Sequence, residues 1–177
     1  DDMSVTDSVR WREWCDPSSY VGKARMPMLF VNGTNDFAYV PESHDMTARL
    51  PQGPVTMCVQ FEMGHSHQDG WAPPEIARFA DHIIRDGPGL TNVGEVKLDG
   101  MTACASVWAD APPVRGGLLY TRDTGTWQER KWYEEPAEVC AGELSADIPE
   151  GTTAFYLTAT DADGMYVSSM LTQPGIT

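Results

Sequence analysis

Two short apolar segments, each followed by a turn that carries a chemically active side chain, constrain this chain more than any other feature. The segment 28–31 is too apolar to be half exposed, which is typical of a parallel strand covered on both faces. It leads into a turn that presents Asp36, and a second apolar segment, 55–61, leads into a turn that presents His65. Parallel strands end at the same edge of a sheet, so the pattern predicts that Asp36 and His65 are neighbours.

An Asp beside a His is the acid–base pair of a Ser-His-Asp triad, in which the carboxylate fixes the tautomer and stabilises the imidazolium. His65 lies nearer the strand end and is expected to be the general base, with His67 as the alternative. The alternative for Asp36 is a turn or helix cap. Ser66 is not expected to be the nucleophile, because no G-x-S-x-G motif occurs in the chain. The sequence thus predicts an acid and a base without their nucleophile.

The same loop suggests two further interpretations. His65, His67 and Asp69 resemble the start of the ligand set of a metal-dependent hydrolase. Gly70 stands where that pattern calls for another His, so neither a metal nor a cofactor is expected. Trp71, together with His67, is a candidate for substrate binding; alternatively, its ring packs the following helix onto the sheet.

A change in the pattern of apolar residues divides the chain into two predicted domains, 1–87 and 94–177, joined by a linker at 88–93. Before the linker, apolar runs alternate with helical patterns. The clearest helix begins at Pro74 and places five apolar residues on one face: Ile76, Phe79, Ala80, Ile83 and Ile84. After the linker, about seven short strands separated by turn residues indicate a small immunoglobulin-like or fibronectin-like β-sandwich.

Within the second part, alternation along 154–159 indicates a strand with one face toward a core. Aromatic residues at strand spacing are more typical of a core, but they could also form a sugar-stacking face: Trp108, Tyr120, Trp127, Trp132, Tyr133 and Tyr156. Cys58 is expected to be a buried free thiol. A Cys104–Cys140 disulfide stays open, since connectivity cannot be read from sequence.

Charge narrows the possible partners. The chain has 12 basic and 26 acidic residues and a formal net charge of −14, which disfavours nucleic acid and anionic membrane surfaces. No apolar run is long enough to span a membrane. The polar start Asp1-Asp2-Met3-Ser4 is expected to be an internal cut in a longer protein.

Several segments resemble known families. Similarity to the C-terminal half of bacterial α/β-hydrolases of the acetylxylan-esterase-like and prolyl-oligopeptidase-like type lies in 27–37, 63–71 and 75–79. Residues 118–132 and 155–161 resemble a small β-domain. This domain is appended to such enzymes and to PhoPQ-activated pathogenicity-related proteins. The resemblance implies the C-terminal part of a doubly wound α/β-hydrolase sheet followed by a β-sandwich. It also implies Asp36 as triad acid and His65 as triad base.

We therefore expect the C-terminal portion of a secreted or periplasmic serine esterase that removes acyl groups from carbohydrate. Its substrate would be a small-molecule or polysaccharide ester, and its serine would come from an N-terminal portion or a second chain. A parallel sheet cut to two strands exposes an apolar edge, so a dimer is also possible. The competing hypotheses are a non-catalytic polysaccharide-binding or accessory module and a metal-dependent hydrolase.

Overall fold

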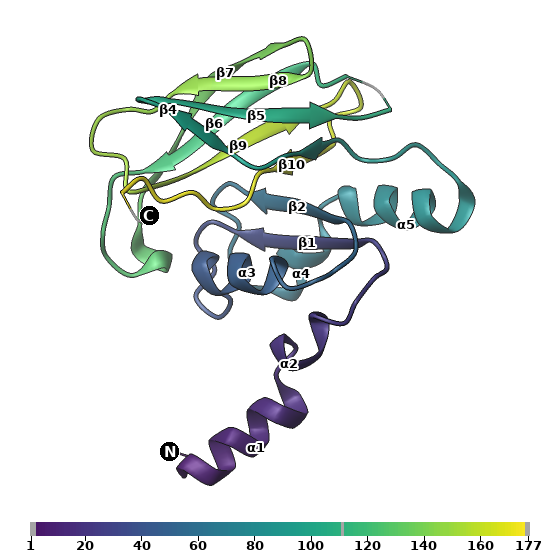
Figure 1. Cartoon of the computed structure of the whole chain (residues 1–177), viewed down its shortest axis with the longest axis vertical. Coiled ribbons are helices and arrows are strands. Elements are labelled where there is room, and N and C mark those ends of the chain that lie inside the picture. Colours follow the sequence, from purple (N-terminus) through teal and green to yellow (C-terminus); the bar gives the residue numbers. More distant parts are fainter. Residues whose placement is uncertain (1–2, 111, 176–177) are drawn as a thin grey trace.

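The computed structural model describes residues 3–110 and 112–175, and ten strands dominate it (Figure 1). They form one sheet with the order β1-β2-β10-β9-β6-β7-β8-β5-β3, and β4 lies against β5 off this path. Within the sheet, β1 and β2 are parallel, and the remaining pairs are antiparallel. The strands are β1 (Met28–Gly33), β2 (Val55–Gln60), β3 (Asn92–Val93), β4 (Lys97–Asp99), β5 (Thr102–Trp108), β6 (Arg115–Thr121), β7 (Trp132–Cys140), β8 (Glu143–Asp147), β9 (Ala154–Thr160) and β10 (Tyr166–Ser168).

The predicted fold class is wrong. In a doubly wound α/β-hydrolase sheet, further parallel strands would continue beside β1 and β2. Here β10 pairs antiparallel with β2, with Met57 opposite Ser168, and the sheet continues through antiparallel strands. The molecule is therefore a mostly-β protein with a mixed sheet. Local periodicity could not reveal this, because the strand that pairs with β2 comes from the far end of the chain. The division into domains 1–87 and 94–177 stays a prediction.

Two apolar clusters lie on opposite faces of the central strands. The sheet folds over itself, so that β5 and β8 pack against β6 and β9 around Phe155 and Leu157. On the other face, Tyr156 and Leu119 pack under helix α3 (Pro41–Ala48), the 3₁₀-helix η1 (Trp127–Glu129) and the C-terminal segment. The strand predicted at 154–159 is present as β9, and its apolar side chains alternate between the two clusters. Both of its faces are buried, however, and not one face alone.

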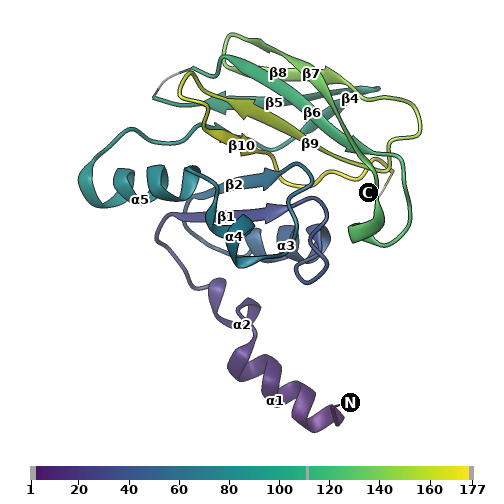
Figure 2. The ribbon, with the colours of Figure 1, turned by 180° about the vertical axis from the view of Figure 1, so that it is seen from behind.

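The helices gather in the first half of the chain. They are α1 (Val5–Cys15), α2 (Ser18–Val21), α3 (Pro41–Ala48), α4 (His67–Trp71) and α5 (Glu75–Arg85), and η1 (Trp127–Glu129) follows in the second half. Helix α5 begins directly after Pro74, as predicted, but Glu75 is its one buried residue. Helix α1 buries no residue, and both views show it extending away from the sheet (Figures 1 and 2).

The described residues contain no helix of the length and apolarity that a membrane crossing requires. All four cysteines are free thiols, and Cys58 is buried, as predicted. Cys104 lies on β5 and Cys140 on β7, and β8 runs between these strands. Neighbouring strands lie roughly 4.8 Å apart, so an intervening strand holds the two sulfurs too far apart for the disulfide that the sequence left open.

Candidate functional site

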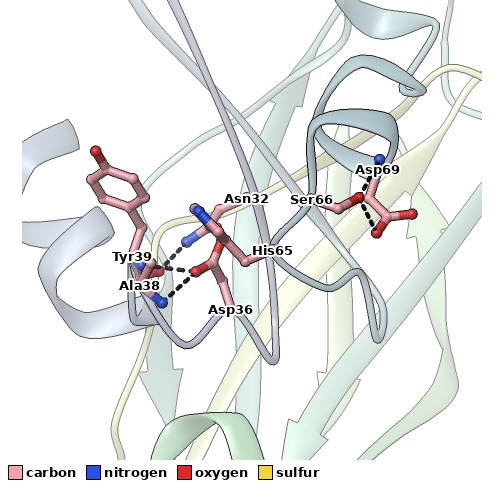
Figure 3. Close-up of polar contacts among 7 residues, drawn as sticks. All are labelled: Asn32, Asp36, Ala38, Tyr39, His65, Ser66 and Asp69. Atoms are coloured by element: carbon pink, nitrogen blue, oxygen red, sulfur yellow. Dashed lines mark hydrogen bonds and ion pairs between the residues drawn. The ribbon is translucent and has the colours of Figure 1, made fainter.

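The turn after β1 holds the Asp36 carboxylate in one orientation (Figure 3). Asp36 is 5% exposed, and its Oδ1 accepts backbone N–H groups from Ala38 at 2.7 Å and Tyr39 at 2.8 Å. The buried Asn32 amide donates to the Tyr39 carbonyl at 2.7 Å and closes the turn. With Oδ1 bonded to the backbone, Oδ2 is left to face the next turn.

The turn after β2 lies directly against the first turn. A Cβ on Gly33 would stand 1.8 Å from the carbonyl oxygen of Met63, so the close approach requires glycine at that position. The buried Thr34 hydroxyl accepts the backbone N–H of Glu62 at 2.9 Å. These contacts tie together two turns that the chain separates by almost thirty residues, and His65 follows immediately.

The structure brings Asp36 and His65 together. His65 Nδ1 lies 2.8 Å from Asp36 Oδ2, and the His65 side chain is 39% exposed. An ionised carboxylate can only accept, so Nδ1 carries the donated proton, and Nε2 is left with a lone pair. This arrangement can remove a proton from a hydroxyl or water placed at Nε2.

Aromatic rings flank the imidazole. Phe37 meets it edge-on with ring centroids 5.1 Å apart, and Tyr39 lies tilted at 5.9 Å. Both rings are well exposed. Both rings follow Asp36 in the same turn, but no motif in the sequence marks them as part of a site.

Ser66 and Asp69 serve the start of α4. The Ser66 hydroxyl donates to Asp69 Oδ2 at 2.7 Å and accepts the Asp69 backbone N–H at 3.0 Å, which is an N-cap (Figure 3). This engagement leaves Ser66 unsuited to attack a substrate. Within the described part of the chain, no cluster of three His, Cys, Asp or Glu side chains has metal-binding geometry, so His65, His67 and Asp69 do not gather as a ligand set.

His67 and Trp71 lie one turn apart on α4 and stack, with centroids 5.7 Å apart and ring planes within 6°. Trp71 is 80% exposed, so it does not pack the following helix onto the sheet. The pair forms a flat aromatic platform close in sequence to His65, which together with Asp36 we call the dyad. The role of this platform in substrate binding stays a prediction.

A second histidine near the dyad was missed. His44 on α3 packs edge-on against Phe30 of β1 with centroids 5.8 Å apart, and its buried Nδ1 has no hydrogen-bond partner in the described structure. Burial lowers the His44 pKa to about 4, although the Asp36 charge opposes this shift. The signal in the sequence was its position one helical turn before the buried Ala48.

Two hollows in the described surface lie away from Asp36 and His65: one is beside Met46 and Leu171, the other beside Arg78 and Asp161. Neither contains Asp36 or His65. The second part of the chain offers no continuous sugar-stacking face, because four of its six candidate aromatics are buried: Tyr120, Trp127, Trp132 and Tyr156.

Comparison with known proteins leaves the family open. No family model and no curated protein matches the chain. Among solved structures, the chain is similar to catalytically inactive OgpA from Akkermansia muciniphila in complex with an O-glycopeptide (glycodrosocin) substrate. The TM-score is 0.33 at 10% sequence identity, over 96% of this chain and 70% of that chain, a likeness too weak to support any argument. The predicted membership of the α/β-hydrolases is wrong: the mixed ten-stranded sheet differs from theirs, and no comparison supports it.

Proposed function

We propose that this chain supplies the acid and the general base of a serine hydrolase that removes acyl groups from carbohydrate. One observation carries the proposal: the 2.8 Å hydrogen bond between Asp36 Oδ2 and His65 Nδ1. Two backbone N–H groups fix the carboxylate from its other oxygen. A buried, oriented carboxylate that leaves Nε2 accessible is the arrangement a general base needs.

The proposed reaction begins when His65 Nε2 takes the proton of a serine hydroxyl as its oxygen attacks the ester carbonyl. The alcohol then leaves with that proton from His65, and an acyl-enzyme remains. Water, activated by the same Nε2, hydrolyses the acyl group and restores the serine. Asp36 stabilises the imidazolium in both steps. The serine and the oxyanion donors come from an N-terminal portion or a second chain.

The carbohydrate part of the proposal rests on the exposed platform of His67 and Trp71. Exposed indole rings suit the apolar face of a sugar, and the platform follows His65 directly in the chain. A substrate of acylated polysaccharide places the enzyme in the periplasm or outside the cell.

Hydrolysis of p-nitrophenyl acetate tests the proposal, with protein expressed from the reading frame that includes the region upstream of these 177 residues. We expect His65→Ala to lower kcat/KM by about 10³-fold or more, and Asp36→Asn by about 10²- to 10⁴-fold. His82→Ala and Asp69→Asn are the matched controls, because these exposed residues lie outside the dyad, and they should change kcat/KM less than about twofold. Unchanged activity in His65→Ala would contradict the proposal.

A further inference from the structure

The hollow beside Arg78 and Asp161 lies where distant parts of the chain meet. Arg78 comes from α5, and Asp110 comes from the loop after β5. Asp161 and Asp163 come from the turn between β9 and β10. In both views α5 lies on the side of the molecule where β9 turns into β10 (Figures 1 and 2). The volume of the hollow is about 270 Å³. Ligand cavities measure roughly 300–1,000 Å³, so this one suits a ligand of few heavy atoms.

The charges that line this hollow do not balance. Three carboxylates and one guanidinium give it a formal charge of −2. Arg78 Nη2 donates to Asp163 Oδ2 at 2.7 Å, so the one cation of the hollow is already paired. Asp110 and Asp161 form no ion pair within residues 3–110 and 112–175. The net charge of −14 on the whole chain adds to a negative potential that attracts cations.

The backbone holds both unpaired carboxylates in place. Asp161 is 7% exposed, and its Oδ1 accepts the backbone N–H groups of Asp163 and Met165, each at 2.9 Å. Asp110 Oδ2 accepts the backbone N–H of Gly89 at 3.1 Å. In each carboxylate, the other oxygen accepts no hydrogen bond from the described residues. Each group therefore keeps one oxygen that can accept a hydrogen bond from a ligand.

Thr91 is the residue whose state points to a ligand. It lines the hollow and is 2% exposed, and its Oγ1 has no hydrogen-bond partner in the described structure. Buried hydroxyl groups normally have a partner, because burying one unpaired is unfavourable. A ligand in the hollow would supply the partner that the protein does not.

The lining groups suit an organic cation better than a metal ion. Within the part of the chain that the structure describes, no three His, Cys, Asp or Glu side chains are arranged to hold a metal. A primary ammonium group carries three N–H donors and no acceptor. The free oxygens of Asp110 and Asp161 can accept from such a group, and so can the hydroxyl of Thr91.

We propose that this hollow binds a small organic cation through a primary ammonium group, which donates to the free carboxylate oxygens of Asp110 and Asp161 and to Thr91 Oγ1. Charge-assisted hydrogen bonds of this kind are stronger than neutral ones. The site shares no residue with the dyad, so this proposal is independent of the proposed function, and each can fail without the other.

Titration of the ¹⁵N-labelled chain with 1,4-diaminobutane, followed by NMR and calorimetry, tests the proposal. We expect saturable shifts concentrated at the amides of Gly89, Thr91 and Asp163. Two control compounds separate charge from hydrogen bonding: 1,4-butanediol has a similar length without the charge, and tetramethylammonium has the charge without an N–H donor. Both should bind more weakly by about tenfold or more. The absence of saturable shifts at the three amides, equal binding of either control compound, or displacement of the amine by equimolar calcium chloride would overturn the proposal.

Matched substitutions locate the contact. Asp161→Asn removes the charge but keeps an oxygen for the backbone N–H groups, and it should weaken binding of 1,4-diaminobutane about tenfold or more. Thr91→Val should weaken binding about fivefold, through loss of one acceptor. Asp99→Asn is the control, because Asp99 is an exposed carboxylate on β4 outside the hollow; it should change the affinity less than about twofold.

Asp110→Asn repeats the charge test should Asp161→Asn fail to fold, because its amide oxygen can still accept the N–H of Gly89. It should also weaken binding about tenfold or more. Unchanged affinity in the folded Asp110 or Asp161 variant, or an equal loss in Asp99→Asn, would contradict the assigned site.

Discussion

Two regions of the molecule differ in how far they bury their apolar side chains. We call residues 3–85 the first region and residues 90–175 the second region. Of the 23 apolar residues that are buried in the described part of the chain, 4 lie in the first region and 19 in the second. Of the 20 large apolar side chains that are exposed in the described structure, 16 lie in the first region. The first region has apolar strands and helices but little to cover them, which is typical of a surface that another polypeptide contacts.

The largest expected difference comes from removing a phenylalanine ring from each region. Phe155 is fully buried in the second region, and Phe37 is 65% exposed in the first. We expect Phe155→Ala to lower the free energy of unfolding by about 4 kcal/mol, through lost burial and the cavity left behind. Phe37→Ala should cost less than about 0.5 kcal/mol. Urea unfolding of both variants measures this, and similar costs would refute the contrast.

The turns that follow β1 and β2 are the closely packed part of the first region, which otherwise exposes many apolar side chains. Gly33→Ala would force a Cβ against the Met63 carbonyl, where backbone and not a flexible side chain must move. We expect a loss of about 3 kcal/mol in unfolding free energy, together with separation of Asp36 from His65. Gly70→Ala is the control, because its Cβ would meet nothing within 4 Å. A fully stable Gly33→Ala protein would show that the turns are not held this closely.

His44, in the first region, makes the free energy of unfolding depend on pH. Its pKa is about 4 in the folded protein and about 6.5 when unfolded, so between these values the unfolded chain binds one more proton. Stability is therefore complete above pH 6.5 and decreases as the pH falls, by about 2 kcal/mol at pH 5. Urea unfolding above pH 6.5 and at pH 5 measures this loss of unfolding free energy. The same titrations of His44→Phe should lack most of it; an unchanged loss would assign the effect to other groups.

Thiol reactivity gives the smallest contrast. Burial raises the pKa of Cys58 to about 12, so this thiol is protonated and shielded in the folded protein. Cys15 and Cys140 are exposed. Titration with dithiobis(nitrobenzoate) should modify these two first and Cys58 only after unfolding. Rapid modification of Cys58 in the native protein would mean that β2 opens readily.

Local chemistry was predictable where neighbouring residues determine it. The contact of Asp36 with His65, the start of α5 at Pro74 and the alternation along β9 all follow from short patterns in the sequence. The sheet was not predictable, because the pairing of β2 with β10 depends on residues far apart in the chain. The same limit applies to Ile83 and Ile84, whose helical face was clear but whose exposure depends on what lies nearby.

The pairing of β2 with β10 has a consequence for synthesis on the ribosome. β2 leaves the exit tunnel long before β10, its neighbour at the other end of the chain, has been translated. Until then its apolar residues lack the strand that separates them from water, and closing so long a loop costs chain entropy. The nascent chain therefore passes through a prolonged stage in which β2 is vulnerable to aggregation and to chaperone capture.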